Sequence, residues 1–233
     1  MQVYDLFPTL VVSFPNVITE EERVEIFNYL KTKDIHPHSA IKGRGGSSYL
    51  SRTFSILKEL NLEDRINEYL IEYNKVLRAG YQLNLSQSWF NVQDHDSMLD
   101  KHMHPNSICS GALYINVDDD STPLCFANYN TYVRYIHHPI VGEEPSKYNA
   151  EYSRVPVKNG DLIIFPSWLE HGSGGMNQTY NRTVISLTHM LLMIMKIIDN
   201  FLPDEDYDSL VHHIVGCRRF PWNYNWYVTA QED

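Results

Sequence analysis

The chain has 233 residues, 43% of them hydrophobic and 21% charged, which is long enough for one large β domain and too apolar for a disordered protein. A surplus of 29 acidic over 19 basic residues gives a net charge of −10 and argues against a nucleic-acid backbone or an anionic membrane as a nonspecific partner. Three cysteines without C-x-x-C spacing and an N-terminus without a signal-peptide pattern favour a cytoplasmic protein.

The N-terminal third of the chain predicts one strand followed by two helices. Residues 6–14 are apolar and β-branched but interrupted by proline, a pattern typical of an edge strand. Thr19 and Glu22 form a capping-box pattern, which predicts a helix that begins there. Apolar residues recur at helical spacing over 62–77 and predict a second helix whose apolar face backs a sheet.

From residue 81 to about residue 198 the hydrophobic period changes to two, which predicts the short strands of a β-sandwich. Residues 88–92 and 109–117 are expected to be strands. The apolar run 184–198 is shorter than a membrane span and is expected to be a buried central strand.

Two hairpins are expected within this region. The polar cluster 118–123 predicts a turn that starts a hairpin into residues 124–126. Asn159-Gly160 predicts a tight turn between residues 155–157 and 162–166.

Two segments carry no strand or helix pattern. Residues 35–50 are rich in glycine and serine and are expected to form a mobile loop that could act as a lid. Residues 128–152 are rich in tyrosine, proline and polar residues and are expected to be an irregular, substrate-facing insertion. Neither segment indicates which substrate would bind.

Three histidines are candidates for a metal site. In an extended chain His102 and His104 share a face, with Met103 on the other, so both imidazoles can meet one metal ion. Pro105 then places the pair at a strand end. His171 also follows a strand and precedes three glycines that let backbone approach a ligand closely. The alternative is that these histidines simply bond to loop carbonyls.

Arg182 is a candidate anion-binding residue. Arg182, Val184 and Ser186 alternate onto one face of the last long strand. An arginine that points into a barrel requires a partner, because a buried unpaired charge is costly. A carboxylate-bearing cosubstrate would satisfy it, and so would a salt bridge to an acidic residue of the chain.

Together these residues resemble the iron(II)/2-oxoglutarate dioxygenases, in particular a branch of oxygenases common in bacteria and their phages. The matching pieces span about residues 6–190: Ser88-Trp-Phe-Asn-Val92, His102-x-His104-Pro-Asn, Ser110-Gly-Ala-Leu-Tyr114, Gly160-Asp-Leu-Ile-Ile-Phe-Pro-Ser-Trp168, His171, and Arg182-x-x-x-Ser186. The resemblance implies a mainly β fold with flanking helices, a double-stranded β-helix or jelly roll.

The same resemblance implies a role for each candidate residue. The three histidines would hold Fe(II), and Arg182 and Ser186 would bind the far carboxylate of 2-oxoglutarate. Asn91 and Tyr114, which alternation places on inward faces, are the next candidates for polar contact with this cosubstrate. With O₂, the enzyme would hydroxylate a small molecule or a peptidyl side chain and release succinate.

One departure from the superfamily leaves alternatives open. Most members use H-x-D or H-x-E, whereas this chain has His104 at the second position. Only one of His102 and His104 would bind the metal if Asp96 or Asp100 supplied a carboxylate. Two other functions are also compatible: a three-histidine cupin enzyme that does not use 2-oxoglutarate, and a non-enzymatic jelly roll such as a virion component.

The domain organisation follows from the same patterns. Residues 1–198 are expected to form the oxygenase-like jelly roll, and residues 199–233 a helical and aromatic appendage or the start of a truncated second unit. The oligomeric state stays open, with a homodimer as one option.

Overall fold

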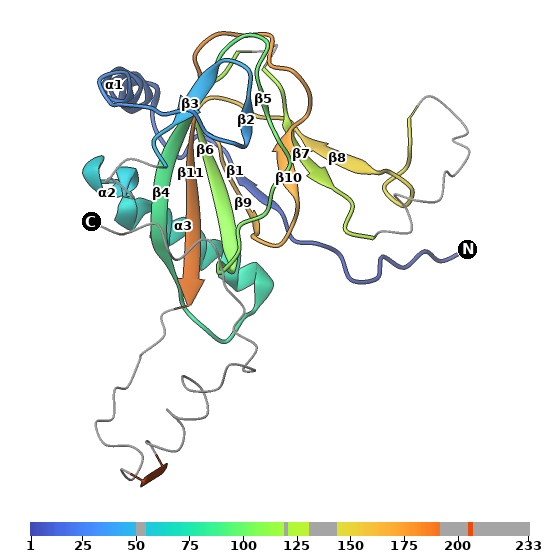
Figure 1. The fold of residues 1–233 in the computed structure, drawn as a ribbon. Helices are drawn as coiled ribbons and strands as arrows, with labels where there is room; N and C mark the ends of the chain where they lie inside the picture. Colours follow the sequence, from blue (N-terminus) through green and yellow to red (C-terminus); the bar gives the residue numbers. More distant parts are fainter. Residues whose placement is uncertain (50–54, 119–120, 131–143, 192–204, 207–233) are drawn as a thin grey trace. The chain divides into compact units, whose positions relative to one another are not determined.

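The computed structural model describes residues 1–49, 55–118, 121–130, 144–191 and 205–206. In chain order the elements are β1 (Val12–Phe14), α1 (Glu20–Leu30), β2 (Ile41–Lys42), β3 (Gly45–Ser47), α2 (Ile56–Glu59), α3 (Glu63–Leu77), β4 (Leu83–Gln93), β5 (Met98–Leu99), β6 (Cys109–Asn116), β7 (Leu124–Ala127), β8 (Tyr152–Val155), β9 (Leu162–Pro166), β10 (His171–Ser173) and β11 (Arg182–Leu191) (Figure 1). Residues 199–233 lie outside the described residues except for 205–206, so the expected boundary at residue 198 stays a prediction.

Both expected helices are confirmed. At the start of α1 the Glu22 backbone N–H donates to the Thr19 hydroxyl at 3.2 Å, and the Thr19 N–H donates to the Glu22 carboxylate at 2.9 Å. This reciprocal pair satisfies two donors that a helix N-terminus otherwise leaves without partners. The second helix, α3, covers Glu63–Leu77 almost as expected and ends at Arg78 in the left-handed conformation, with φ of 56°. Among the described residues, no helix is both long enough and apolar enough to cross a membrane.

The main sheet has six strands in the order β1-β9-β6-β11-β4-β3, and every neighbouring pair is antiparallel. β11 lies at the centre between β6 and β4, which confirms the expected central strand as far as Leu191; residues 192–198 lie outside the described part. The expected edge strand is also confirmed, although β1 covers only Val12–Phe14 and residues 1–8 before it are exposed.

The main sheet is covered on both faces. On one face, apolar side chains of β6, β9 and β11 pack against the helices, with Leu113, Ile164 and Ile185 fully buried. On the other face, Tyr114 and its neighbours pack against β7 of a smaller sheet. Figure 1 shows the helices and the smaller sheet on opposite sides of the main sheet. Because alternate residues of β6 enter two different cores, this strand is buried from Cys109 to Ile115 and lacks the polar alternation of a surface strand.

The smaller sheet has the order β10-β7-β8, and β2 pairs with β5 beside it. Both expected hairpins are therefore wrong: β7 pairs with β10 and β8 rather than β6, and β9 pairs with β1 and β6 rather than β8. Turn residues indicate where a chain reverses, but not which strand it then pairs with. Here successive strands pass from one sheet to the other, so burial in the two cores decides the pairing.

The expectation of an irregular loop over residues 35–50 is also wrong, because this segment contains β2 and β3. Gly45 has φ of 141°, and a Cβ atom at this position would lie only 2.2 Å from the Val92 carbonyl oxygen. The glycine thus permits β3 to pair closely with β4. The glycine-rich composition of this segment predicted a loop, whereas here glycine allows a close approach of two strands. Residues 144–151, the described end of the second irregular segment before β8, contain no helix or strand, as expected.

Candidate metal centre

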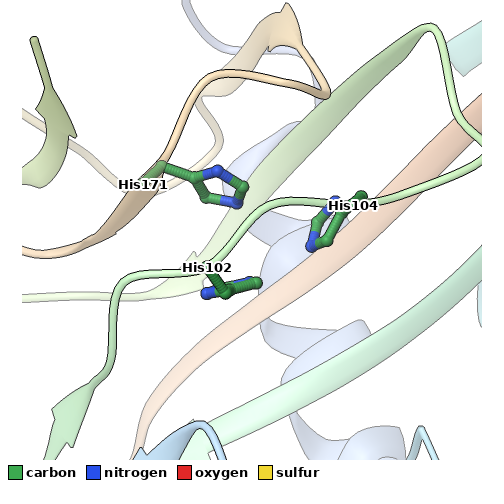
Figure 2. A group of neighbouring side chains, drawn as sticks. All are labelled: His102, His104 and His171. Carbon is green, nitrogen blue, oxygen red and sulfur yellow. The ribbon is translucent and has the colours of Figure 1, made fainter. Parts of the chain in front are cut away.

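Two short segments that are far apart in sequence bring the three histidines together. The backbones of His102 and His171 exchange two hydrogen bonds of 3.0 Å each, so the two residues lie directly opposite one another. The His104 N–H donates to the Ser167 carbonyl oxygen at 3.1 Å, which is a further backbone contact between the two segments. The ring centroids are 4.5–5.0 Å apart, and Figure 2 shows the three rings turned toward one space.

The three rings can share one ion. One nitrogen from each ring lies within 4.8 Å of the other two, so a common point exists no more than about 2.8 Å (4.8 Å divided by √3) from all three. Metal–imidazole bonds are about 2.0–2.1 Å long for Zn²⁺, a divalent ion of similar size to Fe²⁺. Small rotations of the rings therefore suffice to bind a metal at this point.

The histidines are held neutral, which is the form that binds metal. Burial lowers the pKa of His102, lowers that of His104 to about 3, and lowers that of His171 well below its usual value. The two carboxylates considered as alternative ligands do not belong to the group. Asp100 is half exposed with a carboxylate oxygen 3.8 Å from the Lys42 amine, and Asp96 is an exposed neighbour of His95.

The backbone fixes the tautomers of two of these rings. Nδ1 of His102 lies 2.8 Å from the Asp100 carbonyl oxygen, and Nδ1 of His171 lies 2.8 Å from that of Leu169. A carbonyl oxygen only accepts, so both Nδ1 atoms carry the proton and both Nε2 lone pairs are left for a metal. For His104 the corresponding contact is to a side chain, the Ser110 hydroxyl at 2.7 Å.

Arg182 is buried, with 4% of its surface exposed, and it faces into the fold as the alternation predicts. Its guanidinium donates to the Gln93 side-chain oxygen at 2.6 Å and to the Thr122 carbonyl at 3.3 Å, while Nε has no hydrogen-bond partner. The cation lies 5.6 Å from the centre of the Tyr114 ring. Burial lowers the pKa of Arg182, because no carboxylate among the described residues compensates its charge. Among the described residues, Arg182 forms no salt bridge with an acidic residue, which was the alternative expected from the sequence.

Asn91 and Ser186 contact each other instead of Arg182. The Asn91 amide donates to the Ser186 hydroxyl at 2.9 Å. Ser186 pairs with Trp89, whose ring centre lies 5.5 Å from that of His104. Four residues of a strand span about 13 Å, so Ser186 lies nearer to the histidines and Arg182 farther from them.

All seven predicted site residues line one cavity between the two sheets. The lining residues are Asn91, Gln93, Leu99, His102, His104, Gly111, Ala112, Tyr114, Leu124, Phe165, His171, Gly172, Ser173, Arg182, Val184 and Ser186. Gln93 was not among the site residues expected from the sequence, although it continues the alternation of Trp89 and Asn91 and so shares their face. The cavity thus contains three neutral imidazoles at one place and, at another, a guanidinium with no carboxylate partner in the described part of the chain.

Comparison with known proteins agrees with this architecture. Residues 87–188 match a family described as putative 2OG-Fe(II) oxygenase, and this segment contains every predicted site residue. No curated protein matches the chain in sequence.

Three similar solved structures are informative. HygX from Streptomyces hygroscopicus, solved with nickel, 2-oxoglutarate and hygromycin B, has a TM-score of 0.54 and 13% identity over 82% of this chain and 86% of its own. Viral collagen prolyl hydroxylase vCPH from Paramecium Bursaria Chlorella virus-1 has a TM-score of 0.53 and 10% identity over 77% and 94%. The non-heme alpha ketoglutarate dependent epimerase SnoN, from nogalamycin biosynthesis, has a TM-score of 0.52 and 15% identity over 78% and 76%. At these identities the likeness is one of fold, and it confirms the expected jelly roll.

Proposed function

We propose that this chain is an iron(II)- and 2-oxoglutarate-dependent oxygenase that hydroxylates its substrate. The match of residues 87–188 to the 2OG-Fe(II) oxygenase family supports this proposal. His102, His104 and His171 hold the metal, and Arg182 binds the distal carboxylate of the cosubstrate. One observation carries the proposal: the cavity with three convergent neutral imidazoles also contains a buried guanidinium with no carboxylate partner among the described residues.

Charge and donor chemistry both fit these cofactors. Imidazole nitrogen suits Fe(II), and three protein ligands leave coordination positions open. Three neutral ligands leave the ion's double positive charge uncompensated, and Arg182 adds a third charge in the same cavity. A dianion such as 2-oxoglutarate would offset most of this charge at both of its ends. When bound, the metal would supply the oxidising chemistry by which O₂, 2-oxoglutarate and a substrate C–H group become succinate, CO₂ and a hydroxylated substrate.

The chain's own polar residues position the cosubstrate. Gln93 holds Arg182 through the 2.6 Å hydrogen bond, so the guanidinium is oriented before an anion arrives. Ser186 accepts from Asn91, which leaves its own hydroxyl proton free to donate to an oxygen of the cosubstrate. The buried Tyr114 ring forms the wall beside Arg182, and burial raises the pKa of its hydroxyl to about 12, so the phenol stays protonated.

The buried arginine also weighs against the other functions. A three-histidine enzyme that does not use 2-oxoglutarate has no need of an inward cation. A purely structural jelly roll would lose stability by burying a cation that has no carboxylate partner among the described residues. The substrate class stays open between small molecules and peptidyl side chains, since the same fold serves HygX, which was solved with hygromycin B, and a collagen prolyl hydroxylase.

Succinate release in the absence of substrate tests this function. Protein purified anaerobically, loaded with Fe²⁺ and given 2-oxoglutarate and O₂ is expected to form succinate slowly. His171→Ala should abolish this, because two remaining ligands hold the ion weakly. The exposed His36 lies outside the metal group, so His36→Ala should retain the full rate. Iron-containing protein that forms no succinate above the His171→Ala background would favour the binding-protein alternative.

A further inference from the structure

A chain of three serine hydroxyls runs from His104 to the backbone of the main sheet. The Ser110 hydroxyl lies 2.7 Å from His104 Nδ1 and 2.7 Å from the Ser167 hydroxyl, which lies 2.9 Å from the Ser107 hydroxyl. Ser110 and Ser167 are fully buried, so water does not compete for these contacts. We call Ser107, Ser110 and Ser167 the serine relay.

The far end of the relay determines the direction of its hydrogen bonds. The Ser107 hydroxyl lies 2.9 Å from two carbonyl oxygens, those of Cys109 and His189, and it accepts from the His189 backbone N–H at 3.2 Å. Carbonyl oxygens only accept, so the single proton of Ser107 points to them. If it pointed to Ser167 instead, the hydroxyl oxygen would face two carbonyl oxygens with no proton between them, which is repulsive.

The direction then propagates along the relay. With its proton committed, Ser107 accepts from Ser167. Since a hydroxyl has one proton, Ser167 must accept from Ser110, and Ser110 must accept from His104. Nδ1 of His104 therefore carries a proton, and its Nε2 keeps the lone pair that a metal needs.

We propose that the serine relay is a positioning device that fixes the metal-binding tautomer of His104 from a backbone anchor three hydroxyls away. His102 and His171 obtain the same tautomer directly from backbone carbonyls, whereas His104 obtains it through side chains. His104 also stands where most of the superfamily has a carboxylate. A carboxylate has no tautomer, whereas a histidine must be in the Nδ1–H form to bind metal through Nε2, and the relay favours this form. The inference rests on the proposed metal site but concerns the metal-free protein as well.

If the relay works in this way, a substitution at Ser107 should change the tautomer of His104, although the two side chains are not in contact. Ser107→Ala removes the acceptor of the Ser167 proton, so Ser167 can turn to donate to Ser110, and Ser110 can turn to donate to His104. The reversed relay would then favour the Nε2–H tautomer, which cannot bind metal through Nε2. Ser107→Thr keeps the hydroxyl and should keep the relay, because Ser107 is only partly buried and can accommodate a methyl group.

Nuclear magnetic resonance of ¹⁵N-histidine-labelled, metal-free protein reads the tautomers directly. We expect His104 to be in the Nδ1–H form in wild type and Ser107→Thr, and to shift toward Nε2–H in Ser107→Ala and Ser167→Ala. Ser88→Ala is the matched control: this serine is fully buried and its hydroxyl accepts the Leu57 N–H, but it contacts no relay residue. It should leave His104 unchanged.

Titration with Co²⁺ gives a second readout. The affinity should fall about 10- to 100-fold in Ser107→Ala and Ser167→Ala, the usual effect of removing such a support, and should be retained in Ser107→Thr and Ser88→Ala. A wild-type His104 in the Nε2–H form would overturn the inference. So would an unchanged tautomer and Co²⁺ affinity in folded Ser107→Ala and Ser167→Ala. Wild-type protein with the expected tautomer but no succinate formation would count against the proposed function alone.

Discussion

Replacing Arg182 by methionine separates cosubstrate binding from folding. Methionine has a similar length without charge, so Arg182→Met removes the guanidinium and largely fills its place. The change should have opposite effects on two properties. Binding of 2-oxoglutarate should be lost, whereas the metal-free protein should be about as stable as wild type or more stable.

The structure gives the size of both effects. Two hydrogen bonds from a charged donor contribute about 1.5–3 kcal/mol each, so the affinity for 2-oxoglutarate should fall roughly 10²- to 10⁴-fold. For stability, the Gln93 side-chain oxygen and the Thr122 carbonyl oxygen each lose a donor, which costs about 1–3 kcal/mol apiece. Against this, the variant no longer buries a cation that has no carboxylate partner among the described residues, a penalty on the order of several kcal/mol. The two terms leave little net loss.

Calorimetric titration of Ni²⁺-loaded protein with 2-oxoglutarate measures the affinity, and thermal unfolding of metal-free protein measures the stability. Arg182→Lys is a useful companion, because it keeps the charge but cannot form a bidentate pair, and it should bind with intermediate affinity. An affinity of Arg182→Met for 2-oxoglutarate within about threefold of wild type would show that another residue holds the carboxylate. This limit lies well below the roughly 10²-fold loss expected here.

Two further predictions concern the frame of the site. A Cβ atom at Gly172 would lie 2.7 Å from the Leu99 carbonyl oxygen, so Gly172→Ala should displace β10. This displacement should weaken Co²⁺ binding at His171 and lower the melting temperature. A Cβ atom at Gly175 would meet nothing within 4 Å, so Gly175→Ala should change neither property. Burial lowers the pKa of His189 to about 3, so its contribution to stability is complete above pH 6.5 and is lost as the pH falls toward 3. By pH 5 the loss due to His189 alone is about 2 kcal/mol, so denaturant unfolding should show that stability falls less from pH 7 to pH 5 in His189→Met than in wild type, by about this amount.

The parts of the protein that depend on local chemistry were predictable from the sequence. The capping box at Thr19 predicted the start of α1, and helical spacing predicted α3, because both signals act within a few residues. Strand alternation placed Asn91, Arg182 and Ser186 on inward faces, since a period of two does not depend on which strand is the neighbour. The family resemblance carried by these motifs likewise implied the jelly roll before any pairing was known.

Which distant segments meet was not predictable from the sequence and is known from the packed fold. Strand pairing differed from both expected hairpins, because two buried cores and not the turns select the neighbours in this fold. The uncompensated charge of Arg182 and the anchoring of His104 through Ser107 depend on contacts between residues about 60 to 90 positions apart. No sequence period reports such contacts, because each is set by how the packed sheets bring two side chains into hydrogen-bonding distance.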